Sequence, residues 1–281
     1  MQQQHSTCEF NTSDSWVILS PIEQSIKRKI EAVGTPLKEW DIQIYRGVLT
    51  GYNEAFIIST EKRNEILSNC LTADERSRTE ELIRPILRGR DIKRYGYDWA
   101  GLWLINTHNG IKGVKERIHI EDYPAIKVHL DQYWPKISKR ADKGDTPYNL
   151  RNCAYMDDFA QPKIMYSEIV RSPQFYLDKC GHFFPEATTF ILTGEHLRYL
   201  YNIFHSKTFT YFFKRFYAGG GLGEVGYRYK KTFFEQLPIP KMVGTLNQQV
   251  IESAHESTDI EKNCLLLFNF SEDEIAEIER G

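Results

Sequence analysis

Residues 41–59 read DIQIYRGVLTGYNEAFIIS, and this stretch decides the fold. Ile42 and Ile44 alternate with polar residues, two glycines follow, and a short apolar run begins at Ala55. Alternation over a few residues indicates a half-buried strand, and glycines between two such runs indicate a loop. The stretch therefore predicts a strand, a glycine-containing loop and a second strand.

Helical patterns lie on both sides of this stretch. Ser20 and Pro21 form a helix start, apolar residues then recur at helical spacing, and Gly34 ends the helix. We expect further helices at 59–71, 122–141, where Pro135 should cause a kink or an early end, and 195–216. We expect further strands at 102–105, 163–170, 174–177 and 188–192. Because no regular βαβ repeat appears, the pattern favours an α+β fold with mixed sheets flanked by helices.

Two prolines in the stretch 236–240 exclude a central strand or a helix there and indicate the edge of the main body. Beyond them the pattern is helical and acidic, with a helix start at Ser271. We expect a flexible lead-in at residues 1–15, one domain at 16–241 and a short helical acidic tail at 242–281.

The composition hides an uneven distribution of charge. The formal net charge of the 281 residues is −2. Nine acidic and two basic residues between Glu252 and Gly281 give −7, so the rest of the chain carries +5. A basic body suits a polyanionic partner.

No apolar run approaches the roughly 18 residues of a membrane-spanning helix, and residues 1–14 are polar. Five cysteines without CxxC spacing indicate reduced thiols rather than disulfides or a zinc site. These features predict a cytoplasmic protein with no membrane partner.

Three segments carry clustered positive charge, and aromatic residues lie within or beside them. Residues 76–94 carry a net +4, residues 136–151 carry +3 and residues 207–231 carry +5. Phosphate groups of a nucleic acid would bind such clusters with release of counterions. Solvated surface faces are the alternative interpretation, and charge counting alone leaves the two equally supported.

No motif assembles a catalytic centre or a metal site. Residues 221–226 match GxGxxG, but basic aromatic runs flank them where a dinucleotide site needs a strand and a helix. Asp157 and Asp158 lack a third ligand at fixed spacing and are better explained as a loop turn. We therefore predict neither catalytic residues nor a metal in this chain.

Several segments of the chain form an ordered series of motifs. Residues 84–92 read RPILRGRDI, and the others are residues 16–20, 34–40, 46–58, 123–130, 140–144, 162–166 and 237–240, and the acidic stretch 270–278. These segments resemble the TaqI-like C-terminal specificity domain of type II restriction–modification DNA adenine methyltransferases, and residues 84–92 are similar to the family's RPxLxGxDI segment. They occur in this order along the chain, and the resemblance extends over roughly residues 16–280.

The resemblance implies a target recognition domain that binds double-stranded DNA. In this family the domain follows an adenine-N6 methyltransferase domain that binds S-adenosylmethionine. The catalytic tetrapeptide [DNS]PP[YFW] is absent from the sequence, so the resemblance implies no cofactor in this chain and no methyl transfer by it. It implies a covalently linked N-terminal methyltransferase domain in the parent protein and leaves open whether the parent also cleaves DNA as an endonuclease.

We expect the DNA-binding residues to lie in loops within or beside the basic clusters. They are Thr50, Gly51, Asn53, Arg88, Arg90, Lys93, Arg140, Lys143, Tyr148, Asn149, Arg151, Arg228 and Lys230. For the glycines a required turn is at least as good an explanation, and each asparagine alone is more often a turn residue. Two alternatives stay open: a nuclease or nucleotide-dependent enzyme that uses residues 221–226 and stray carboxylates, and a protein-interaction module with aromatic faces.

Overall fold

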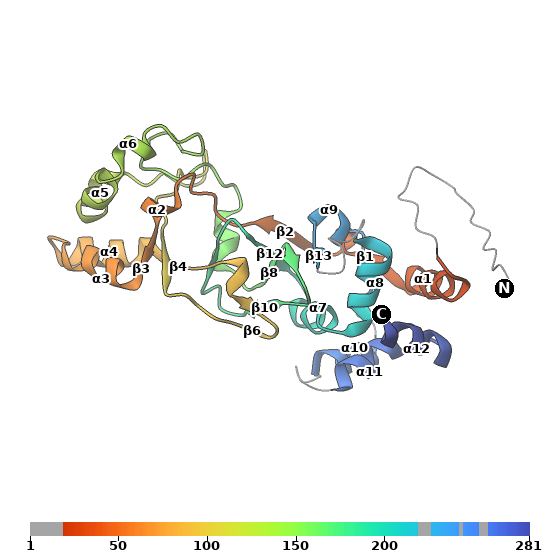
Figure 1. The fold of residues 1–281 in the computed structure, drawn as a ribbon. Helices are drawn as coiled ribbons and strands as arrows, with labels where there is room; N and C mark the ends of the chain where they lie inside the picture. The colour runs from red at the N-terminus through yellow and green to blue at the C-terminus, as the bar shows by residue number, and fades with distance from the viewer. Residues whose placement is uncertain (1–18, 219–225, 242–243, 253–257) are drawn as a thin grey trace. The chain divides into compact units, whose positions relative to one another are not determined.

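The computed structural model describes residues 19–218, 226–241, 244–252 and 258–281 (Figure 1). It divides into two compact units that interleave along the chain. Unit 1 consists of Met1–Gln43, Glu168–Phe175 and Gly194–Gly281, and unit 2 consists of Ile44–Ser167 and Tyr176–Thr193. The lead-in expected at 1–15 and residues 221–225 of the glycine motif lie outside the described residues.

Unit 2 contains two four-stranded sheets, with helices beside one of them. Its strands are β2 (Ile42–Arg46, from Ile44 onward), β3 (Ile57–Ser59), β4 (Ile83–Leu87), β5 (Ile92–Lys93), β6 (Gly96–Tyr97), β7 (Leu102–Ile105), β8 (Lys163–Ser167), β10 (Phe175–Asp178), β11 (Phe184–Pro185) and β12 (Thr189–Gly194). Its helices are α2 (Asn53–Phe56), α3 (Thr60–Ser68), α4 (Ala73–Leu82), η2 (Gly89–Asp91), η3 (Ile120–Asp122), α5 (Pro124–Asp131), α6 (Trp134–Ile137) and η4 (Met156–Ala160).

The first sheet has the strand order β11-β4-β7-β3, with β7 antiparallel to both neighbours and β11 parallel to β4. Ile58 pairs with Trp103, and Arg84 pairs with Leu104. Helices α3 and α4 pack beside this sheet, and α5 packs on α3. Ile86, Leu104 and other fully buried aliphatic residues form the core between them.

The second sheet has the order β10-β8-β12-β2, in which β12 runs antiparallel to β8. Lys163, at the start of β8, is fully buried, and its Nζ lies 2.8 Å from Oδ2 of Asp178. Backbone amides of His182 and Phe183 also donate to the Asp178 carboxylate, at 3.0 and 2.9 Å. A buried ion pair with these extra hydrogen bonds meets the geometric requirement for tolerating two charges in a core.

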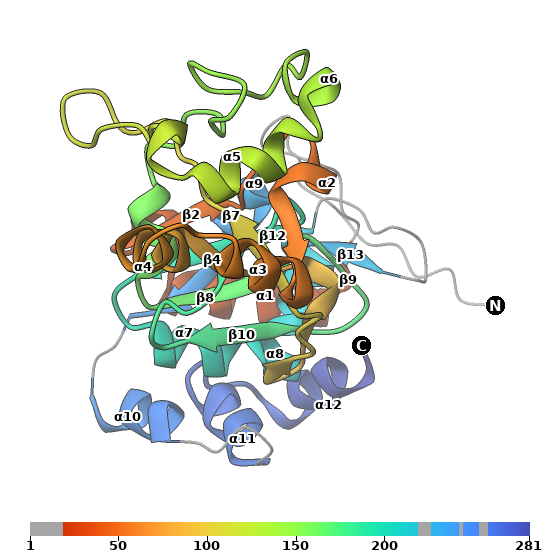
Figure 2. The same ribbon diagram turned by 90° about the vertical axis from the view of Figure 1, so that its left-hand side faces the viewer.

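Unit 1 is mainly helical. Its elements are α1 (Pro21–Val33), β1 (Gly34–Pro36), η1 (Leu37–Glu39), β9 (Ile169–Val170), α7 (Leu197–Phe204), α8 (Lys207–Phe212), η5 (Phe213–Tyr217), β13 (Tyr227–Arg228), α9 (Lys231–Phe234), β14 (Pro238–Pro240), α10 (Thr245–Glu252), α11 (Thr258–Leu266) and α12 (Glu272–Arg280). Figure 2 shows α10, α11 and α12 beside α7 and α8. Because α12 also packs on α1, the C-terminal helices are an integral part of this unit.

The α+β fold with mixed sheets flanked by helices is confirmed. Helix α1 begins and ends as the sequence predicts, with Ser20 as its cap, and β7 matches the predicted strand at 102–105. Residues 236–240 include β14, which pairs only with the short β1 among the described strands and so is not a central strand.

The helix predicted at 122–141 is divided into α5 and α6 beside Pro135, which confirms the kink or early end expected there. The break precedes Pro135, because proline fits the first turn of a new helix. Two local predictions were wrong. The apolar run that begins at Ala55 starts inside α2, and the second strand begins only at Ile57. The helix predicted at 195–216 is interrupted at His205 and Ser206, where the Ser206 side chain caps α8.

Candidate nucleic-acid interface

Three loops of unit 2 come together into what we call the loop cluster. They are residues 47–53 between β2 and α2, residues 106–119 between β7 and η3, and residues 138–155 between α6 and η4. The second and third loops lie at the same end of this unit as α5 and α6 (Figure 2). A backbone hydrogen bond from Leu150 N to Thr107 O, 2.8 Å long, joins these two, and Thr107 Oγ1 donates to the Tyr148 carbonyl at 2.6 Å.

The Arg140 guanidinium holds the first and third loops together. It is buried and donates to four backbone carbonyls, those of Thr50, Asp142, Pro147 and Asn149. Its carbon also lies 4.4 Å from the centroid of the Phe56 ring. Burial lowers the pKa of Arg140 to about 10, partly opposed by Asp142, so the group stays cationic at neutral pH. Its contacts with carbonyls therefore leave a positive charge in the loop cluster.

Gly51 allows the first loop to approach the third. Its φ is +68°, and a Cβ there would lie 2.8 Å from the Asp142 carbonyl oxygen. Thr50 is buried and donates from Oγ1 to Oδ1 of Asn53 at 2.5 Å. Close packing of backbone on backbone therefore explains the glycine, and a local turn explains the polar side chains beside it.

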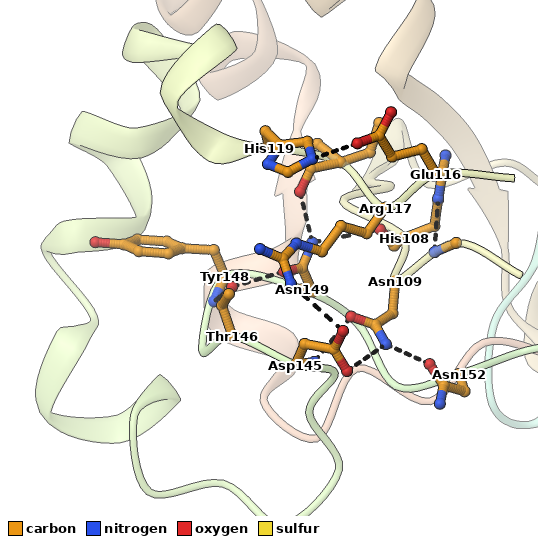
Figure 3. Close-up of polar contacts among 12 residues, drawn as sticks. His108, Asn109, Glu116, Arg117, His119, Asp145, Thr146, Tyr148, Asn149 and Asn152 are labelled. Carbon is orange, nitrogen blue, oxygen red and sulfur yellow. Dashed lines mark hydrogen bonds and ion pairs between the residues drawn. The ribbon is translucent and has the colours of Figure 1, made fainter. Parts of the chain in front are cut away.

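Asn149 joins the second and third loops (Figure 3). Its side chain is buried and donates from Nδ2 to the carbonyl oxygen of Ile118 at 2.8 Å and to that of His108 at 3.3 Å. Its Oδ1 accepts from Thr146 Oγ1 at 2.6 Å. Since these bonds satisfy both ends of the amide, Asn149 shapes the surface and has little capacity left for reading a base.

Asn109 lies at the centre of a second polar network (Figure 3). It donates from Nδ2 to Asp145 Oδ1 at 3.1 Å and to the side chain of Asn152, and it accepts from the Asp145 backbone amide at 2.8 Å. Arg117 Nη1 lies 3.4 Å from the other oxygen of Asp145. The network closes one wall of a cavity of about 700 Å³ between the second and third loops, and Lys112 and Lys115 also line it.

Exposed cations lie in the second and third loops and in the adjoining helix α6. Lys143 donates to a backbone carbonyl, and Arg151 lies 3.2 Å from Asp142. Lys112, Lys136 and Lys139 are exposed and make no ion pair within the described part of the chain. The loop cluster therefore combines a built polar scaffold with unneutralised positive charge.

Tyr148 stands at the junction of the third loop with α5 and α6. Its hydroxyl donates to Asp131 Oδ1 at 2.6 Å, and its ring centroid lies 5.3 Å from that of Trp134, which is 43% exposed. Lys127 Nζ lies 5.3 Å from the same tyrosine ring. The two half-exposed rings give the cationic surface an aromatic part, a combination suited to nucleic acid.

The structure does not bring the other predicted site residues into the loop cluster. Arg88 forms a bidentate contact with Asp91, at 2.8 and 2.7 Å, in the turn after β4. Arg90 and Lys93 are exposed beside it, and Figure 1 shows the nearby β6 away from α5 and α6. Two more, Arg228 and Lys230, are exposed in unit 1. A role toward DNA stays a prediction for every residue of the set.

Sequence reasoning missed the second loop, residues 106–119. Its signal was present: GIKGVKER, residues 110–117, places two glycines among three cations and one acid. Counting charge in longer windows passed over this short segment. Two glycines at turn spacing beside lysines would have identified an exposed cationic turn.

Nothing in the described residues assembles a metal site, since no group of three or more His, Cys, Asp or Glu side chains has suitable geometry. Asp157 is paired with Lys115 at 2.8 Å, and Asp158 accepts from Thr193 at 3.5 Å. No helix in the described ranges has the length and apolar character needed to cross a membrane.

The chain was compared with curated proteins and with solved structures. A search of curated proteins finds no match. The fold is similar to that of a solved type IIG restriction endonuclease, BpuSI, with a TM-score of 0.59 and 15% sequence identity over 92% of this chain. The chain spans 31% of that enzyme's length, and at this identity the likeness concerns the fold alone.

Residues 84–239, more than half of the chain, match the model of the TaqI-like C-terminal specificity domain. The matched range includes the second and third loops of the loop cluster and extends across both units. The match confirms the resemblance that the ordered sequence segments indicate. This chain therefore belongs to the family of TaqI-like C-terminal specificity domains.

Proposed function

We propose that this specificity domain binds double-stranded DNA sequence-specifically through the loop cluster of unit 2. The observation that carries the proposal is the unneutralised charge of Lys112, Lys136 and Lys139 beside a scaffold fixed by Arg140 and Asn109. Phosphate groups would bind the exposed lysines, and exposed loop side chains between them would contact base edges in a groove.

The scaffold makes this surface suitable for recognition. Because Arg140 and Asn149 fix the backbone of three loops, little conformational entropy is lost when the loops bind a duplex. The surface residues can then differ between relatives without disturbing the buried hydrogen bonds that shape the loops. We infer that, within each loop, the residues that hold the loop in place differ from the residues that contact DNA bases.

We further propose that the domain positions a target adenine for an adenine-N6 methyltransferase domain linked to its N-terminal side in the parent protein. The linked domain would hold S-adenosylmethionine and flip the adenine out of the duplex, while this chain holds the surrounding sequence. Two observations support this proposal: the family is one of specificity domains, and the fold is similar to that of a restriction endonuclease. Any DNA cleavage by the parent protein would be carried out by its other domains and is not part of this proposal. A cytoplasmic location follows from a DNA substrate and stays a proposal.

Selection from a random duplex library with the 281-residue chain tests the binding proposal. We expect a defined sequence to be enriched and its affinity to fall steeply with salt, because each phosphate contact contributes close to −0.9 to the log–log slope. Enrichment without sequence preference, or a flat slope, would reject it. The coding region upstream of residue 1 tests the second part: an in-frame methyltransferase with its catalytic tetrapeptide is expected, and unrelated coding sequence would contradict it.

A further inference from the structure

The tip of the second loop is a narrow hairpin, residues 111–115. Ile111 and Lys115 exchange two backbone hydrogen bonds of 2.8 Å, and Val114 N donates to Ile111 O at 2.9 Å. Gly113 has φ +77°, which permits the reverse turn. At the base, Gly110 has φ +72° and no room for a Cβ, which would lie 2.4 Å from the Lys115 carbonyl oxygen. The hairpin is therefore specified by two glycines.

Val114 stands at this tip with 79% of its surface exposed. Lys112 and Lys115 flank it, the first without an ion pair among the described residues and the second 2.8 Å from Asp157. The base of the hairpin is fixed, because His108 Nδ1 accepts from Gly110 N at 3.1 Å and Arg117 contacts Asp145. A branched apolar side chain is thus presented to solvent on a fixed turn between two cations.

We propose that the hairpin at residues 111–115 enters the major groove of the bound duplex and that Val114 contacts a thymine methyl group there. This inference rests on the proposed function. The major groove is wide enough for a two-stranded β-ribbon, and the hairpin, a turn closed by one bridge between Ile111 and Lys115, is as narrow as such a ribbon. The thymine methyl is the apolar feature of that groove. The lysines on either side of Val114 match the phosphates along the groove edges in charge. Val114 is then a specificity-determining residue, and the lysines are sequence-independent contacts.

Val114→Ala tests the inference, with Leu71→Ala as the matched control. Leu71 is 81% exposed in the same unit, in the turn before α4 and outside the loop cluster. We expect Val114→Ala to weaken binding to the selected duplex about fivefold to tenfold and to leave a scrambled duplex within about twofold of wild type, since a base contact carries sequence information. The Leu71→Ala variant should bind both duplexes as wild type does.

Deoxyuridine replacement identifies the contact. Each thymine of the selected duplex is replaced in turn, which removes the methyl group and leaves base pairing intact. At least one replacement should weaken wild-type binding by a similar factor and have no further effect on Val114→Ala. If Val114→Ala binds the selected duplex as wild type does, or if no replacement matters, the inference is wrong. If the wild-type chain shows no salt-dependent DNA binding at all, the proposed function has failed instead.

Discussion

The loop cluster of unit 2 and the helix pair α1–α12 of unit 1 both concentrate charged side chains, and they use them differently. In unit 1, Lys29 Nζ lies 2.6 Å from the Glu274 carboxylate, and Arg215 is paired with Glu23. In the loop cluster the buried cation, Arg140, is bound by neutral carbonyls, and the exposed Lys112 and Lys139 make no ion pair with any residue that the structure describes.

The comparison shows that the number of charged residues in a region does not determine how much net charge the region presents. An ion pair between helices cancels its own field and holds two elements together. A guanidinium bound by carbonyls also holds elements together, but its positive charge is not neutralised. This charge adds to that of the exposed lysines in the same region. Net positive potential therefore gathers at the loops, although the whole chain has a formal charge of −2.

Arg140→Ala should have the largest effect. It leaves four backbone carbonyls without their donor, so we expect a loss of about 3 kcal/mol in the free energy of unfolding and loss of measurable specific DNA binding. Urea denaturation measures the first and duplex titration the second. The exposed neighbour variant Lys139→Ala should stay within about 0.5 kcal/mol of wild type. Equal stability of the two variants would refute the holding role of Arg140.

Glu274→Gln probes the other side of the comparison. Burial alone would raise the pKa of Glu274, but hydrogen bonds from Lys29, the Ser271 backbone and Ser25 outweigh it and lower the pKa to about 2 from an ordinary 4.5. The carboxylate therefore stabilises the fold above pH 4.5, and this contribution is lost as the pH falls toward 2. At pH 6 we expect the free energy of unfolding of wild type to exceed that of Glu274→Gln by about 2 kcal/mol. Urea denaturation should show that this difference in unfolding free energy becomes smaller below pH 4.5. A difference that does not change with pH would contradict the stabilising role of the Glu274 carboxylate.

Replacing Lys112, Lys136 and Lys139 together by glutamine should leave stability unchanged, since none of them has an ion-pair partner among the described residues. We expect the log–log slope of DNA affinity against salt to become shallower by close to three, and binding to selected and scrambled duplexes to weaken alike. A triple substitution of Lys38, Lys179 and Lys241 is the control, because these exposed lysines lie outside the loop cluster and also make no ion pair among the described residues. If that control changes the slope as much, the charge of the loop cluster has no special role.

Arg90→Ala should have the smallest effect. Arg90 is exposed but lies in the turn after β4, outside the loop cluster. We expect less than a twofold change in duplex affinity and a stability within about 0.5 kcal/mol of wild type. A tenfold loss of affinity would show that the binding surface extends to this turn, as the sequence alone suggested.

Local signals in the sequence predicted much of the fold. Ser20, Pro21 and Gly34 delimit α1, because caps and proline act within one turn of the chain. Pro135 correctly indicated an interruption of the helix, but α2 was mistaken for part of a strand. A four-residue helix followed at once by a strand leaves a pattern too short for periodicity to resolve.

The candidate site was harder to predict because burial decides what a polar residue does. Arg140 and Asn149 were selected for their charge and amide, but both are buried and donate to backbone carbonyls, including those of Thr50 and Ile118 in loops distant in sequence. Lys143 and Arg151 do lie on the surface of the third loop. The glycines beside Val114 indicate an exposed turn, but its position at the tip of a hairpin is seen only in the fold.

The central claim is that the loop cluster binds duplex DNA through unpaired cations on a fixed scaffold. Titration of the selected duplex with the 281-residue chain over a range of salt concentrations, beside the triple lysine variant, tests it most directly. The account predicts a steep slope for wild type and a slope shallower by close to three for the variant. A flat wild-type slope, or identical slopes for the two proteins, would contradict it.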